Sequence, residues 1–102
     1  METITKETIR RKNDVFRKTF IGGRIVITQG VQYSPHLETI FSKVKSFDDF
    51  NDGNDPYGEH DFGKVVIEGT EYFFKIDYYD DQYQYFKEDG NRVMTIMRTD
   101  EY

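Results

Sequence analysis

The sequence predicts an α+β fold in which two helices pack on one face of a small, mainly antiparallel sheet. Three observations lead to this prediction. Apolar residues recur at helical spacing in two segments before residue 48, they alternate as in strands after residue 61, and glycine or proline separates these segments. The expected order is helix, strand, helix and then three strands, in a single domain over residues 1–102.

The first helix is expected over residues 5–20. Ile9, Phe16 and Phe20 share one stripe of this helix, because they lie seven and four residues apart. The glycine pair at residues 22–23 is expected to end it, since glycine readily adopts the left-handed conformation found after a last helical turn. A strand over residues 24–28 follows.

The second helix is expected over residues 34–47. Ser34 is a favourable N-cap, and Pro35 would occupy the first helical position, where its missing N–H has no cost. The apolar residues then repeat at steps of three and four, which predicts a buried face. These residues are Leu37, Ile40, Phe41, Val44 and Phe47.

Three strands complete the predicted sheet. Residues 62–79 form two runs rich in β-branched and aromatic residues, joined across Glu68, Gly69 and Thr70 as a hairpin. In the second run one face is expected to join the core, and its residues are Phe74, Ile76 and Tyr78. The opposite face carries Phe73, Lys75, Asp77 and Tyr79. The last strand is expected over residues 92–98.

Composition excludes several classes of protein. The chain has no cysteine, which excludes disulfides, a thiol nucleophile and any metal site that needs cysteine. Its first residues contain no apolar run, and no segment approaches the ~18 apolar residues of a membrane span, so a cytoplasmic protein without membrane contact is expected. No cofactor is predicted.

Charge is distributed unevenly along the chain. Residues 1–24 carry seven Lys or Arg against three Asp or Glu, a net of +4, whereas residues 25–102 carry seven against sixteen, a net of −9. The segment at residues 48–61 alone has six acidic residues and no Lys or Arg, and it is expected to be a long loop. A protein this acidic is not expected to bind nucleic acid directly.

Four segments together resemble a known family. They read NDVFRKTFIGGRIV, NDPYGEHDFG, YFFKIDYYD and TIMRTDEY, and the similarity covers residues 13–102. The family is a group of small bacterial and mobile-element proteins catalogued as a domain of unknown function, DUF3768. The resemblance implies one self-contained domain but no reaction. Many relatives have tryptophan where this chain has Phe74, and the segment between Asp80 and Arg92 differs from theirs.

The loop raises the possibility of a metal centre around His60. Histidine and carboxylates are common metal ligands, and Glu59, Asp61, Asp77 and also Asp55 are the candidate partners. The spacing fits no known metal motif, and Asp48 or Asp49 as a first ligand fails the calcium-loop register. The same residues offer an acid–base pair, yet no nucleophile motif accompanies them. The simpler interpretation is that His60 fixes the loop through hydrogen bonds.

The favoured prediction is a small non-enzymatic interaction protein. Acidic residues interleaved with aromatic ones suit binding to a protein partner with a basic surface. The predicted contact residues are Asp48, Asp49, Asp52, Asp55, Tyr57, Glu59, Asp61, Asp77, Tyr79, Asp80 and Asp81. In its most specific form the hypothesis is an inhibitor, encoded by a mobile element, that occupies the basic groove of a nucleic-acid-handling host protein such as a defence nuclease. The alternative is a metal-dependent enzyme centred on His60.

Overall fold

The computed structural model describes residues 3–102. Three α-helices, four strands and a final 3₁₀ turn follow one another along the chain. In order they are α1 (Lys6–Thr19), β1 (Arg24–Ile27), α2 (Gln29–Gln32), α3 (Leu37–Ser46), β2 (Phe62–Ile67), β3 (Thr70–Tyr79), β4 (Asn91–Arg98) and η1 (Thr99–Glu101). None of the helices among these residues has the length and apolar character needed to cross a membrane.

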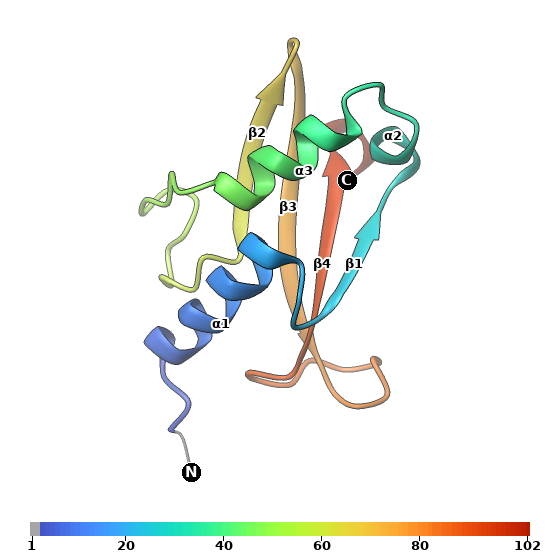
Figure 1. Cartoon of the computed structure of the whole chain (residues 1–102). Coiled ribbons are helices and arrows are strands. Elements are labelled where there is room, and N and C mark those ends of the chain that lie inside the picture. Colours follow the sequence, from blue (N-terminus) through green and yellow to red (C-terminus); the bar gives the residue numbers. More distant parts are fainter. Residues whose placement is uncertain (1–2) are drawn as a thin grey trace.

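The four strands form one sheet in the order β1-β4-β3-β2. The β2–β3 and β3–β4 pairs are antiparallel, whereas β1 runs parallel to β4. The sheet is therefore mixed, because the chain crosses from one edge to the other through α2 and α3 before the hairpin returns β4 beside β1. Helices α1 and α3 lie on one face of the sheet, which confirms the predicted α+β layers (Figure 1).

The core lies between these helices and the sheet. Phe16 of α1 and Ile40 and Val44 of α3 are almost fully buried. They belong to the same cluster as the sheet residues Phe74, Ile76, Tyr78, Met94 and Ile96. The predicted core face of residues 70–79 is thus confirmed. Phe73 departs from the pattern, since it is buried on the opposite face, where the rings of Phe62 and Tyr102 pack against it.

The second predicted helix begins later than expected. Residues 29–32 form the extra helix α2, and α3 starts at Leu37 with His36 as its N-cap. The Ser34 hydroxyl accepts a hydrogen bond from the His36 backbone N–H, but this bond belongs to the connection between the two helices. The N-cap prediction was wrong because a serine followed by proline also suits a tight turn.

The hairpin over residues 62–79 and the acidic loop, residues 48–61, form where the sequence predicts them. Strands β2 and β3 are joined by Glu68 and Gly69, both with positive φ, as a two-residue turn of this kind requires. Residues 47–61 contain no helix or strand. This segment leaves the end of α3, passes beside α1 and enters β2 (Figure 1).

Candidate functional site

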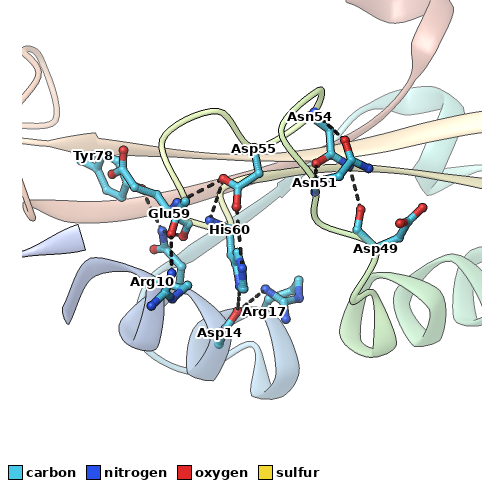
Figure 2. Close-up of polar contacts among 12 residues, drawn as sticks. Arg10, Asp14, Arg17, Asp49, Asn51, Asn54, Asp55, Glu59, His60 and Tyr78 are labelled. Carbon is cyan, nitrogen blue, oxygen red and sulfur yellow. Dashed lines mark hydrogen bonds and ion pairs between the residues drawn. The ribbon is translucent and has the colours of Figure 1, made fainter. Parts of the chain in front are cut away.

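The acidic loop is fixed to α1 through His60. The His60 Nδ1 atom lies 2.9 Å from a carboxylate oxygen of Asp14, and Nε2 lies 3.7 Å from one of Asp55 (Figure 2). The imidazole also stacks on the Phe50 ring, with centroids 3.9 Å apart and planes inclined by 4°. These contacts confirm that His60 holds the loop, and they stabilise its own left-handed backbone at φ 56°.

Asp55 belongs to the contacts that fix the loop, and it does not lie on the surface. Its side chain is 5% exposed, and one carboxylate oxygen accepts hydrogen bonds from the backbone N–H groups of Glu59 and His60, both at 3.1 Å. The predicted contact residue Asp55 is therefore buried inside the loop. Its two neighbours in the predicted set, Tyr57 and Glu59, lie on the turn that Asp55 closes.

A buried polar network connects helix α1 and the loop to the sheet. The Asn13 amide is fully buried and donates to the Glu59 carbonyl at 2.9 Å and to the Tyr78 hydroxyl at 2.8 Å. Its oxygen accepts from Arg92 Nε at 2.6 Å. Arg92 in turn pairs with Asp89 at 2.8 Å. Helix α1, the loop, β3 and β4 thus meet at one residue.

Sequence reasoning missed the partners that α1 supplies. Asn13, Asp14 and Arg17 form the anchor cluster together with Asp55 and His60. The available signal was Asn13, because it lies on the apolar stripe of the helix, four residues after Ile9 and three before Phe16. A polar residue at a core position of a helix generally has a buried partner.

Charge in the anchor cluster is compensated. Burial alone would raise the pKa of Asp14, but hydrogen bonds from His60 and Arg17 outweigh burial and place this pKa below its usual value. The Arg17 guanidinium, whose side chain is 2% exposed, donates to Asp14 at 2.8 Å and lies over the Phe50 ring. Burial would also raise the pKa of Asp89, but hydrogen bonds from Lys12 and Arg92 outweigh burial and lower this pKa.

The residues proposed for a metal centre do not converge. Both ring nitrogens of His60 face carboxylates of the anchor cluster, and Asp77 pairs instead with Lys75 at 3.2 Å. Within residues 3–102 no group of three or more His, Asp or Glu side chains is arranged to hold a metal ion. The geometry gives the metal-enzyme alternative no donor set.

The exposed half of the loop forms one wall of a groove against the end of β3. The groove has a volume of about 440 Å³, and three carboxylates and four aromatic rings line it. Among the described residues no basic side chain contributes to this lining. We call it the acidic groove, and it is lined by Tyr57, Glu59, Asp61, Ile76, Asp77, Tyr78, Tyr79 and Phe86. Tyr57 and Phe86 are 69% and 74% exposed. A second hollow adjoins it across Tyr57, Glu59, Tyr78 and Phe86 and reaches the first turn of α1.

Charge in the acidic groove is compensated only at Asp77, which pairs with Lys75. Burial raises the pKa of Asp61 to about 6, and the nearby carboxylates of Glu59, Asp55 and Asp77 add to the effect. Burial likewise raises the pKa of the Tyr78 phenol. The smaller, electrostatic part of the Asp61 shift reflects the carboxylates gathered around it.

The remaining predicted contact residues lie outside this groove. Asp48, Asp49 and Asp52 are exposed on the part of the loop that follows α3. The Asp80 carboxylate accepts from the Gln84 backbone N–H, and Asp81 accepts from the Asn91 amide, so both shape the turn between β3 and β4. The structure therefore gathers Tyr57, Glu59, Asp61, Asp77 and Tyr79 and leaves the others apart.

Comparison with known proteins places the chain in a family. No curated protein and no solved structure matches it significantly. A family model described as "Protein of unknown function (DUF3768)" matches residues 27–101, a range that includes the acidic loop, β2, β3 and β4 and leaves α1 outside. The chain therefore belongs to the DUF3768 family of proteins of unknown function.

Proposed function

We propose that this protein is an interaction domain that binds a basic segment of a protein partner in the acidic groove. The observation that carries the proposal is the lining of the groove, in which Glu59, Asp61 and Asp77 stand among aromatic rings and, within residues 3–102, no Lys or Arg side chain takes part. Lys75 lies nearby and pairs with Asp77. An exposed aromatic surface with uncompensated charge is typical of binding sites.

The chemistry of the groove favours Lys or Arg side chains. A guanidinium or ammonium group placed there would pair with carboxylates and lie against aromatic faces, two interactions that reinforce each other. The protein already uses this arrangement internally, because the Arg92 guanidinium pairs with Asp89 and lies 5.2 Å from the centroid of the Tyr78 ring. A cationic side chain of a partner would make the same two contacts, with a carboxylate and an aromatic ring, in the acidic groove.

Fluorescence anisotropy with a labelled octa-arginine peptide tests this proposal at physiological ionic strength, where exposed charges beyond ~8 Å are largely screened. The groove variant carries Glu59→Gln, Asp61→Asn and Asp77→Asn. The matched control carries Asp48→Asn, Asp49→Asn and Asp52→Asn, which removes the same number of charges from the loop outside the groove.

We expect the groove variant to weaken binding by roughly tenfold or more, because charge-assisted contacts are lost. The matched control should weaken it by less than about threefold, since exposed charges contribute little individually. Equal losses in the two variants would mean that bulk charge alone attracts the peptide and would overturn the proposal. Absence of binding by the unaltered protein would overturn it as well.

The most specific form of the proposal concerns the kind of partner. An acidic, aromatic surface can occupy the basic groove of a nucleic-acid-handling protein, and the protein would then act as an inhibitor. The net charge of −5 and the largely uncompensated groove support this form. The test is to capture partners on the immobilised protein and to ask whether duplex DNA displaces them. A different outcome is a partner that the groove variant fails to capture but that duplex DNA does not displace. It would restrict the proposal to a basic partner of another kind.

A further inference from the structure

A second cavity lies at the other end of β3 from the acidic groove. It has a volume of about 570 Å³ and forms where the α2–α3 connection, the β2–β3 turn and the end of β4 meet. Its polar lining includes Ser34, His36, Thr70, Tyr72 and Arg98. All of these residues fall within the range matched by the family model.

Hydrogen-bond donors of this cavity retain unused capacity. Tyr72 is 4% exposed, and its hydroxyl meets the Ser34 hydroxyl at 3.5 Å, a long contact for two oxygen atoms. Arg98 uses Nε to bond Asp100 at 2.5 Å. Within residues 3–102 its two terminal amino groups make no hydrogen bond, so the planar end of the guanidinium is available to a ligand.

The Glu101 carboxylate at the edge of the cavity is already satisfied. It accepts hydrogen bonds from the Thr28 hydroxyl at 2.6 Å, the Gly30 N–H at 2.8 Å and the Arg98 N–H at 2.9 Å. A Cβ at Gly30 would lie 2.4 Å from a Glu101 oxygen, so a larger residue there would displace the Glu101 carboxylate. Glu101 therefore braces the cavity, while Glu68 lies on the exposed turn at its rim.

We propose that this cavity binds a small molecule with an aromatic ring that carries an oxyanion, either a carboxylate or a phosphate monoester. The fork of the Arg98 guanidinium matches two oxygens of such a group, and the Tyr72 and Ser34 hydroxyls can donate to it. The Tyr33 ring, which is 76% exposed, and Pro35 offer an apolar wall for the ring of the ligand.

Titration of the ¹⁵N-labelled full chain with benzoate and phenyl phosphate tests the proposal, with benzamide as the uncharged control. We expect one or both anions to shift the amide signals of residues 29–36, 68–72 and 98–101. Benzamide should bind roughly tenfold more weakly, because it cannot form a charge-assisted pair with Arg98. The tighter of the two anions identifies the oxyanion that the cavity prefers.

Two variants separate a binding role from a structural one. Arg98→Gln should weaken anion binding by about tenfold, and Tyr72→Phe by about threefold, because each removes a donor and Tyr72→Phe keeps the buried ring. Lys87→Gln removes an equal charge from an exposed position outside the cavity and should have no effect.

Three results would overturn the proposal. These are the absence of signal shifts with both anions at about 20 mM, equal binding of benzamide, and unchanged affinity in both variants. The groove variant, with Glu59, Asp61 and Asp77 neutralised, should bind these anions normally. The two proposals therefore succeed or fail independently.

Discussion

Asp14 of helix α1 and Asp61 at the end of the acidic loop differ in the direction of their pKa shifts. Asp14, in the anchor cluster, accepts hydrogen bonds from His60 and Arg17, and its pKa falls despite burial. Asp61, in the acidic groove, has acidic neighbours, and burial together with their charge raises its pKa to about 6. The comparison teaches that an acidic residue stabilises this fold only where the chain supplies a donor.

The acidic loop therefore contributes residues both to the anchor cluster and to the acidic groove, and the two have different roles. Carboxylates of the anchor cluster accept hydrogen bonds from His60, Arg17 and the loop backbone, which holds the loop against α1. The groove presents the exposed rings of Tyr57 and Phe86 together with three carboxylates, of which only Asp77 pairs with a cation, and this leaves binding capacity at the surface. Substitutions in the anchor cluster should lower stability, whereas neutralising the groove carboxylates should change stability little or increase it.

The largest effect is expected for Asn13→Ala. This change removes a fully buried amide and leaves Arg92 Nε, the Tyr78 hydroxyl and the Glu59 carbonyl without their partner. The free energy of unfolding should fall by about 3 kcal/mol, since orphaned buried polar groups are costly. Urea denaturation measures it, with the exposed Gln82→Ala as control. A loss below about 1 kcal/mol would contradict the central role of Asn13.

A smaller loss is expected for His60→Ala. The variant loses the bond to Asp14 and the stacking on Phe50, and alanine is unfavourable at φ 56°. Thermal and urea unfolding should show a loss of about 2 kcal/mol. His36→Ala is the matched control, because the His36 side chain makes no capping hydrogen bond. Equal stability of the two variants would show that the loop is held by other contacts.

Asp61→Asn is expected to act in the opposite direction. The folded protein keeps a proton on Asp61 up to a pKa of about 6, whereas the unfolded chain loses it near 3.8. Between these values the folded state binds more protons, so stability falls as pH rises from 4 to 6 and the cost stays at neutral pH. Because Asp61 is partly exposed, Asp61→Asn should stabilise by only about 1 kcal/mol at pH 7.

Urea denaturation across this pH range checks the prediction. The unaltered protein should lose stability between pH 4 and 6, and Asp61→Asn should flatten that slope. Asp14 provides the contrast, because its lowered pKa gives stability that is lost only as pH falls below about 4. A slope that Asp61→Asn leaves unchanged would assign the titration to another group.

The smallest effect on stability is expected for Asp77→Asn. Asp77 makes an exposed pair with Lys75 at 3.2 Å, and such surface pairs contribute about 0.5 kcal/mol or less. The Asp77→Asn protein should nevertheless bind octa-arginine more weakly, since the Asp77 carboxylate lines the acidic groove. A variant that unfolds more readily but binds normally would place Asp77 among the structural residues.

Much of the fold was predictable from local patterns. The stripe of Ile9, Phe16 and Phe20 and the alternation along residues 70–79 determined element type and core face, because periodicity reports directly which side is buried. The start of α3 was not predictable, since Ser34 and Pro35 suit a turn as well as a helix start. The parallel pairing of β1 with β4 joins segments far apart in the sequence and leaves no local signal.

The candidate site was predictable only in part. The sequence pointed to the acidic loop and to its aromatic neighbours, yet it grouped buried Asp55 with exposed Tyr57 and named Asp77 as a partner of His60. The true partner, Asp14, belongs to α1, which is 46 residues away in the sequence. Pairing over such a distance depends on how the elements pack, and residue spacing does not encode it.

By itself the sequence determined the α+β class, the acidic loop and its composition, and it favoured a fixing role for His60 over a metal-binding one. The tertiary structure decided which carboxylates are compensated and which are not. The physical reason is that a side chain's charge is fixed by its type, whereas its pKa, its exposure and its capacity to bind depend on the neighbours that folding places around it.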